Sequence, residues 1–358
     1  MKKVRGGVKT HFSFLWAQIL AKQALSRALR SLQGLPDAQE SALYLLSHCT
    51  GGKTLPFAQK LLRSNAALTP AQLAQFEALC ARRASREPLQ YIIGHWDFGS
   101  LRDVAVRAPT LVPRPETEDL ASLSAQVAAG LGLSQGRLLD VGTGSGVLGL
   151  SILSQLPGWQ GTGIDTSQAA CALARENAAT CGLAQRFSVE LADLRAYSPL
   201  QPVDLIVSNP PYVPEEALPT LQPEVAQWED PGALAGQAPR GLGLPLALLA
   251  HASSRWVQQR PGTPLLMEVD SQHPALIHAM LSSGSSSSSA PLLLLPASGL
   301  GQPLAAQSVA PLTAAEVAQA EAAMGGVRLS DLKGAWEWVA GYYSCNNLPR
   351  IVQLRSLR

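Results

Sequence analysis

The 358-residue sequence lacks the cysteine and histidine patterns that build metal sites. Its five cysteines are scattered without a Cys-x-x-Cys pair, and its six histidines show no His-Glu-x-x-His motif or comparable ligand spacing. Ligands paired at short, fixed spacing are the usual sequence mark of a zinc site. We therefore predict no bound metal, and we expect the cysteines to be buried or incidental thiols in a reducing compartment.

Long apolar runs and strong overall charge are also absent. No stretch approaches the roughly 18 uninterrupted apolar residues of a membrane span, so we expect no membrane partner. Charged residues make up only 15% of the chain, and the net charge is +2. The first 36 residues hold seven basic and no acidic residues, which leaves 21 basic against 26 acidic residues in the remainder. The net negative charge of residues 37–358 is poorly suited to binding duplex nucleic acid, and we expect no direct nucleic-acid binding.

The acid-free start of the chain allows two interpretations. Residues 11–32 can form an amphipathic helix, and a basic amphipathic segment is typical of an organellar targeting peptide. This interpretation favours a mitochondrion or a plastid over the cytoplasm. Alternatively, residues 1–16 are a short basic lead, and the first helix of the folded domain begins near residue 17. Both interpretations stay open at this stage.

Helical periodicity dominates residues 17–87. Thr69 is a suitable N-cap with Pro70 at the first helical position, and the apolar residues that follow have helical spacing. Residues 88–120 change character, because they are richer in β-branched and aromatic residues and carry glycine breaks. The sequence therefore predicts a small helical domain followed by a β-hairpin linker.

Residues 121–358 alternate strand patterns with helix patterns. Strands separated by single helices indicate βαβ units and a mostly parallel sheet. Residues 283–325 are low in complexity and serine-rich, and we interpret them as a flexible insertion. We expect the closing strands at 327–334 and 348–355, separated by a second insertion at 335–347.

The segment LLDVGTGSGVLG is the most informative part of the chain. An apolar strand leads into Asp140, and Gly142, Gly144 and Gly146 follow before a helix begins. Glycines let the backbone approach a ligand closely, and a helix N-terminus offers unpaired N–H groups. The segment also satisfies G-x-G-x-x-G, so a dinucleotide site is formally open. A carboxylate beside the loop would repel a pyrophosphate and attract a cation, which favours S-adenosylmethionine (SAM).

The next two predicted strands also end in acidic residues. Asp165 lies 19 residues beyond Gly146, where a carboxylate can accept hydrogen bonds from both ribose hydroxyls. Its alternative role is an N-cap for the following helix. Asp193 and Leu194 end the third strand, where they are suited to flank an adenine. Three such strand ends in succession favour a SAM site.

A rigid motif, SNPPYVPE, follows the apolar run DLIV. Its prolines have no N–H group and cannot continue a strand ladder. Asn209 is held outside the helical region by the proline that follows it. The motif is either a plain strand-terminating turn or a rigid array of hydrogen-bond acceptors at a strand end.

With these motifs in order, the sequence resembles the HemK/PrmC family, the glutamine methyltransferases of peptide chain release factors. The resemblance rests on VPRPETEDL, DVGTGSG, NPPY and WEDPGALAG, and it runs from about residue 20 to 270 and resumes weakly at 327. It implies a class I SAM-dependent methyltransferase fold, Rossmann-like with a mostly parallel sheet, after the helical domain and hairpin linker. It also implies methylation of the side-chain amide of the glutamine in the GGQ loop of release factors.

The resemblance assigns roles to individual residues. The side-chain oxygen of Asn209 and the carbonyl of Pro210 would hold the substrate amide, while Pro211 stiffens the turn and Tyr212 packs on the substrate. Cofactor contacts are expected from Asp140, Gly142, Thr143, Gly144, Ser145, Gly146, Asp165, Asp193, Leu194 and Asn209. In the PRPET segment, Arg114, Glu116 and Thr117 either contact cofactor or substrate, or lock the linker.

Two rival functions remain. An NPPY-type amino-methyltransferase acting on RNA or DNA bases would use the same acceptor chemistry. The net negative charge of residues 37–358 argues against this function. A non-catalytic scaffold of the same fold is disfavoured because the cofactor and acceptor motifs are both intact. The helical domain would dock the release factor, through Arg82, Arg83 and Arg86 unless these form a solvated face. The turn AGQAPRGLG departs from the family's GG-x-DG-like pattern, which leaves its geometry open.

Overall fold

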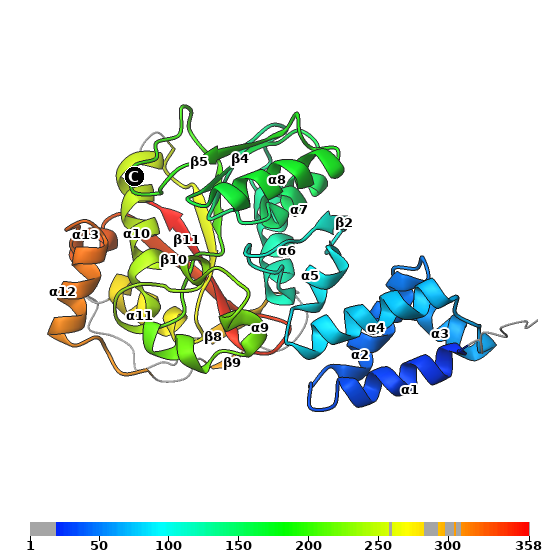
Figure 1. The fold of residues 1–358 in the computed structure, drawn as a ribbon. Helices are drawn as coiled ribbons and strands as arrows, with labels where there is room; N and C mark the ends of the chain where they lie inside the picture. Colours follow the sequence, from blue (N-terminus) through cyan, green and yellow to red (C-terminus); the bar gives the residue numbers. More distant parts are fainter. Residues whose placement is uncertain (1–18, 258–259, 283–292, 298–303, 306–308, 358) are drawn as a thin grey trace, which may run out of the picture. The chain divides into compact units, whose positions relative to one another are not determined.

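The computed structural model describes residues 19–257, 260–282, 293–297, 304–305 and 309–357 (Figure 1). The chain divides into two compact units, Met1–Ile93 and Gly94–Arg358. Residues 1–18, which are half of the basic 36-residue start expected to contain a targeting segment, lie outside the described residues. No helix among the described residues is long and apolar enough to cross a membrane.

The first unit is helical, as predicted. From residue 19 onward, its helices are α1 Ala21–Ser31, α2 Ala38–Cys49, α3 Leu55–Ser64, α4 Pro70–Ala84 and α5 Leu89–Ile93. The predicted start of α4 is confirmed, because Thr69 is the N-cap and Pro70 is the first helical residue. The Thr69 hydroxyl accepts the Gln72 N–H at 3.2 Å, and the Gln72 side chain accepts the Thr69 N–H at 3.0 Å. This reciprocal capping satisfies two donors that the helix itself cannot.

Arg83 does not belong to an exposed docking face, and this expectation from the sequence was wrong. The residue is only 3% exposed. Its Nη2 atom lies 2.7 Å from Asp37 Oδ1, and its Nε donates to Ser41 Oγ at 3.1 Å. A buried guanidinium needs such partners, so Arg83 ties α4 to the start of α2. Arg82 is paired with Glu87.

The second unit begins with the predicted β-hairpin. Strands β1 His95–Phe98 and β2 Leu101–Ala105 are antiparallel, with His95 opposite Ala105 and Phe98 opposite Leu101. Helix α6, Pro115–Gly130, then begins inside the PRPET segment, with Pro115 as its first residue.

A nine-stranded sheet forms the centre of the second unit, in the order β5-β4-β3-β6-β7-β11-β10-β8-β9. Strands β3 to β7 are mutually parallel, and β11 is antiparallel to both of its neighbours. This confirms a mostly parallel sheet. The strands are β3 Arg137–Val141, β4 Gln160–Asp165, β5 Phe187–Leu191, β6 Leu205–Ser208, β7 Pro264–Glu268, β8 Leu293–Pro296, β9 Leu304–Ala305, β10 Trp336–Tyr343 and β11 Pro349–Ser356.

Helices cover both faces of this sheet (Figure 1). Successive strand residues point to opposite faces, so Leu138 and Leu139 enter separate cores. One core is closed by α6, α7 Val147–Gln155 and α8 Gln168–Thr180. The other is closed by α10 Gly243–His251, α11 His273–Ser282, α12 Ala314–Ala323 and α13 Leu329–Lys333. Shorter elements are η1 Glu215–Thr220, α9 Pro223–Ala226, η2 Pro231–Ala233, η3 Pro239–Gly241 and η4 Ala252–Trp256.

The C-terminal elements correct two predictions. Residues 327–334, expected as a strand, contain the helix α13, and residues 335–347, expected as an insertion, contain the strand β10. The expected flexible insertion at 283–325 contributes β8, β9 and α12 among its described residues. Strand β8 pairs with β10, and α12 packs Ala320 into the core, so these described parts of the segment belong to the fold.

The strand order places a crevice beside β3. The chain first moves outward from β3 to β4 and β5, and it then returns to β6 and β7 on the other side. Ligands of open α/β sheets bind at such a switch point, outside the carboxyl ends of the strands. A cavity of about 350 Å³ opens at this position.

Candidate active site

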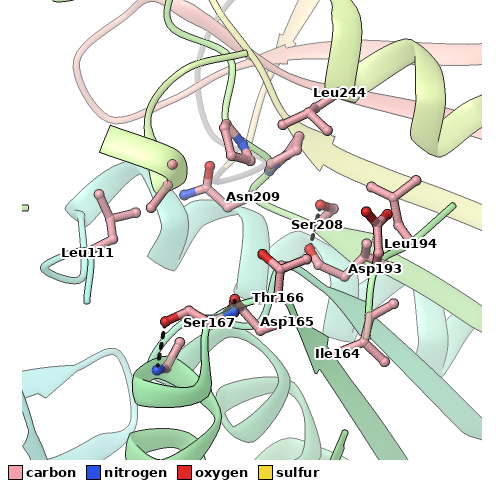
Figure 2. A pocket seen from close by; sticks show the side chains of 18 of the residues that line it. Leu111, Ile164, Asp165, Thr166, Ser167, Asp193, Leu194, Ser208, Asn209 and Leu244 are labelled. Carbon is pink, nitrogen blue, oxygen red and sulfur yellow. Dashed lines mark hydrogen bonds between the residues drawn. The ribbon is translucent and has the colours of Figure 1, made fainter. Parts of the chain in front are cut away.

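The cavity is lined by the ends of four neighbouring strands and by the loops that follow them (Figure 2). In this view Asp165 lies below Asn209, and Asp193 and Leu194 lie to one side. The structure therefore brings together residues that are far apart in the sequence. The predicted residues that line the cavity are Gly142, Gly144, Asp165, Asp193, Leu194, Asn209, Pro210 and Pro211.

The glycine-rich loop turns sharply between β3 and α7. Gly142, Gly144 and Gly146 all have positive φ, of 70°, 55° and 83°. Side chains disfavour this region, which explains the glycines. A Cβ atom added at Gly144 would meet no atom within 4 Å, so the loop edge is open where it lines the cavity. The loop therefore allows a ligand to approach the backbone closely.

Asp140 lies behind this loop and is not among the residues that line the cavity. Its Oδ2 accepts the Thr143 hydroxyl at 2.7 Å and the Gly149 N–H at 3.1 Å. The carboxyl is fully buried, and this burial raises its pKa from 3.8 to about 7. Ser145 is also buried, and its carbonyl accepts the Asn177 side chain at 2.9 Å. Asp140 and Ser145 therefore hold the loop in its conformation through hydrogen bonds and do not line the cavity.

Asp165 is an acceptor at the wall of the cavity. Its two oxygens accept the Ser167 N–H at 2.8 Å and the Gly144 N–H at 2.9 Å. The N-cap of α8 is Ser167, whose hydroxyl accepts the Ala170 N–H, so Asp165 is not the helix cap. Burial raises the pKa of Asp165 above its ordinary value. Each carboxylate oxygen has two acceptor positions, so both retain capacity for a ligand.

Asn209 follows β6 and belongs to a chain of buried and partly buried hydrogen bonds. Its Nδ2 donates to Thr117 Oγ1 at 3.0 Å, and the Thr117 hydroxyl donates to Glu268 Oε2 at 2.7 Å. The Tyr212 hydroxyl donates to Glu268 Oε1 at 2.8 Å. Sequence reasoning missed Glu268, although it ends the buried strand β7 just as Asp165 ends β4 and Asn209 follows β6. That shared position at a strand end was the available signal.

The three PRPET residues have separate partners. Arg114 Nη2 lies 2.7 and 2.6 Å from the two carboxylate oxygens of Glu229. Burial raises the pKa of Glu229, and the adjacent guanidinium acts in the opposite direction. Glu116 accepts the Asn346 side chain at 2.8 Å. Arg114 therefore locks the linker to the WEDPG segment, whereas Thr117 connects directly to Asn209.

Comparison with known protein families identifies both units. The PrmC N-terminal domain family matches residues 23–94, and the methyltransferase small domain family matches residues 122–224. The MTRF1L release factor glutamine methyltransferase of Homo sapiens is 36% identical over 261 residues, which are 70% of this chain and 75% of that protein. The chain belongs to the release factor glutamine methyltransferase family.

Bacterial members of the release factor glutamine methyltransferase family show similar agreement. The protein of Cereibacter sphaeroides is 38% identical over 251 residues, covering 70% of this chain and 85% of that protein. The protein of Deinococcus radiodurans is 38% identical over 262 residues, covering 73% of this chain and 88% of that protein. The predicted resemblance is thereby confirmed.

Residues of α12 and of the segment before it hold the turn at residues 235–243. This turn departs from the pattern expected for release factor glutamine methyltransferases. Gln237, Ala238 and Arg240 have positive φ without being glycine. The Arg240 side chain is held by Glu316 of α12 at 2.9 Å and donates to the Ala310 carbonyl at 2.7 Å. Gln237 lines the cavity and accepts Arg195 Nη2 at 2.9 Å. Residues 309–316 of the expected insertion therefore support a turn that borders the site.

Proposed function

We propose that the protein transfers a methyl group from SAM to the side-chain amide nitrogen of the glutamine in the GGQ loop of peptide chain release factors. The observation that carries this proposal is the anchoring of Asn209 through its Nδ2, which leaves Oδ1 as an acceptor beside the cavity. The related proteins named as release factor glutamine methyltransferases support the choice of substrate.

The cavity suits SAM better than a dinucleotide. Its lining includes Asp165, Asp193 and Asp230 against the single guanidinium of Arg195. This negative balance favours a sulfonium and disfavours a pyrophosphate. Asp165 would accept the ribose hydroxyls, and Asp193 and Leu194 would flank the adenine. Bound SAM supplies an electrophilic methyl group.

Under this proposal, some residues of the glycine-rich loop contact the cofactor and others hold the loop in its conformation. Gly142 and Gly144 line the cavity and let the cofactor approach the backbone. Asp140, Thr143, Ser145 and Gly146 act from behind by holding the loop in shape. Their predicted cofactor role is therefore indirect.

The acceptor motif addresses the weak nucleophilicity of a carboxamide. The nitrogen lone pair is delocalised into the carbonyl, so the nitrogen must be placed in line with the methyl group. Asn209 Oδ1 and the Pro210 carbonyl would accept its two N–H bonds, and both residues line the cavity. These fixed acceptors also stabilise the positive charge that develops on nitrogen during transfer. The proton leaves after transfer, so no strong base is required beforehand.

We infer a mitochondrial or plastid location from the basic, acid-free start of the chain. A fluorescent reporter fused to residues 1–36 should enter one of these organelles in eukaryotic cells. A reporter that stays in the cytoplasm would favour the cytoplasmic alternative.

A transfer assay with labelled methyl-SAM tests the proposed function. Purified organellar and cytosolic release factors are offered beside total RNA and DNA. Label should appear on a release factor and should vanish when its GGQ glutamine is replaced in a Gln→Ala version. Label on nucleic acid instead would contradict the substrate and retain the acceptor chemistry.

A further inference from the structure

Glu268 is a buried carboxylate that contacts Tyr212 of the NPPY motif and Thr117, the hydrogen-bond partner of Asn209. It is 2% exposed and lies at the end of β7. One oxygen accepts the Thr117 hydroxyl, and the other accepts the Tyr212 hydroxyl. The charged groups facing it are Arg350 of β11, whose guanidinium carbon lies 5.8 Å from the centre of the Tyr212 ring, and Glu116 of α6. When ionised, a carboxylate so placed sets the direction of both of these hydrogen bonds, because it can only accept.

The direction of these bonds follows from the donors available. An ionised carboxylate only accepts, and a threonine hydroxyl has one hydrogen to donate. When Thr117 donates that hydrogen to Glu268, its oxygen can only accept from Asn209. Asn209 must then turn Nδ2 toward Thr117, as observed at 3.0 Å. Its Oδ1 is thereby reserved for another partner.

We propose that Glu268 and Thr117 are positioning residues that fix the orientation of the Asn209 amide. This inference rests on the proposed function, because it explains how the site offers an acceptor to the substrate amide. A reversed Asn209 would present Nδ2 to the glutamine N–H groups, and two donors facing each other form no hydrogen bond. Thr117 and Glu268 therefore act on the reaction through Asn209 and need not touch the substrate.

Two substitutions at Thr117 separate this role from simple packing. Thr117→Val keeps the shape and removes the hydroxyl, whereas Thr117→Ser keeps the hydroxyl and removes the methyl group. We expect Thr117→Val to lower kcat roughly 10- to 100-fold, the scale for a misplaced catalytic contact. Thr117→Ser should stay within about threefold of the parent. A packing role predicts the opposite order, because only the serine variant leaves a gap.

Controls separate this effect from cofactor binding and from folding. The SAM dissociation constant, from calorimetry, should change less than about twofold in both variants, a difference of roughly 0.4 kcal/mol. Thr162→Val removes a hydroxyl that pairs with Ser188 outside the cavity lining, and its kcat should match the parent. If Thr117→Val does not fold, Glu268→Gln tests the same point, because a neutral amide both donates and accepts and no longer dictates the direction.

The outcomes are distinguishable. A parent protein that labels a release factor, with Thr117→Val or the substitute Glu268→Gln variant equally active, would overturn the positioning role alone. A parent protein that labels no release factor would overturn the proposed function and this inference together. Loss of kcat in Thr117→Val with recovery in Thr117→Ser would support both.

Discussion

Asn209 is the residue on which the proposed transfer depends most directly. Removing its side chain removes one of two acceptors for the substrate amide while leaving the carboxylates of the cavity in place. We expect Asn209→Ala to lower methyl transfer at least about 100-fold, the scale for losing a preorganised polar contact to the transition state. SAM affinity should be largely retained. The checks are labelled transfer to a release factor and calorimetry with SAM.

A matched control is Asn346→Ala. Asn346 contacts Glu116 in the turn between β10 and β11 and does not line the cavity. Its transfer rate should match that of the parent. Transfer by Asn209→Ala within tenfold of the parent would contradict the acceptor role.

Asp165 offers a second prediction at the residue scale. Its carboxylate lines the cavity and retains acceptor positions beyond its bonds to Gly144 and Ser167. Asp165→Ala should weaken SAM binding by roughly 1.5 to 3 kcal/mol, the range for hydrogen bonds to a charged group. Calorimetric titration measures this directly.

The control for Asp165 is Asp97→Ala. Asp97 accepts the Asp103 N–H within the β-hairpin and does not line the cavity. Its removal should leave SAM affinity unchanged. Equal dissociation constants for Asp165→Ala and the parent would show that Asp165 only supports the loop.

The part of the site that could be predicted from the sequence consists of residues at the ends of strands. Asp165, Asp193 and Asn209 line one cavity because parallel strands bring their carboxyl ends to one edge of the sheet. Asp140 is the penultimate residue of β3, and its carboxylate accepts hydrogen bonds from Thr143 and Gly149 and does not line the cavity. Glu268 was missed because its partners, Thr117 and Tyr212, are 151 and 56 residues away. Long-range side-chain pairing has no local signature.

At the scale of elements, strand β3 carries a buried titrating group, Asp140, behind the loop that leads to α7. The folded-state pKa of Asp140 is about 7 against an ordinary 3.8, so between these pH values the folded state holds a proton that the unfolded state has lost. Stability therefore falls as pH rises through this window. Asp140→Asn does not titrate, so its melting temperature relative to the parent should increase from about pH 4 to pH 7 and then level off.

Differential scanning calorimetry at intervals across this range measures the effect. The informative quantity is the difference between the two proteins, because other buried carboxyls titrate in both. A difference that stays constant with pH would contradict a raised pKa for Asp140.

The brace between α12 and η3 joins the segment expected as an insertion to the turn that borders the cavity. Arg240 and Glu316 are side-chain exposed by only 25% and 20%, and they support the turn that holds Gln237 at the cavity. We expect Glu316→Gln to raise the SAM dissociation constant only modestly, by about two- to fivefold, since exposed and partly exposed ion pairs contribute little.

Glu337→Gln is the matched control, because it breaks the exposed pair with Arg355 between β10 and β11. Its SAM affinity should equal that of the parent. If both variants bind SAM equally well in calorimetry, the brace has no influence on the cavity.

The C-terminal elements show where local sequence patterns failed. Residues 327–334 were read as a strand, but Arg328 N–H is accepted by Asp331 at 3.4 Å and the segment starts a short helix. The segment WEWVAGYY forms β10 because it pairs with β11 along its length, which is a tertiary effect. In the alternating βα region, by contrast, local periodicity and tertiary packing agree, and the predicted mostly parallel sheet is observed.

At the scale of the whole molecule, the chain contains two compact units with separate tasks under the proposed function. Every residue that lines the cavity lies between Thr110 and Leu248, within the second unit. The helical unit has its own buried core, including Phe76 and Leu45. Cofactor binding should therefore depend on the second unit alone, whereas recognition of the release factor should require the helical unit.

Residues 94–358 expressed without the helical unit test this division, since compact units with their own cores can fold alone. We expect SAM affinity within about twofold of the full chain, a change of roughly 0.4 kcal/mol. Methyl transfer to an intact release factor should fall at least about tenfold through lost docking, seen as a higher KM. Circular dichroism establishes folding of the shortened protein. Unchanged KM in a folded, SAM-binding protein would place substrate recognition entirely in the methyltransferase unit.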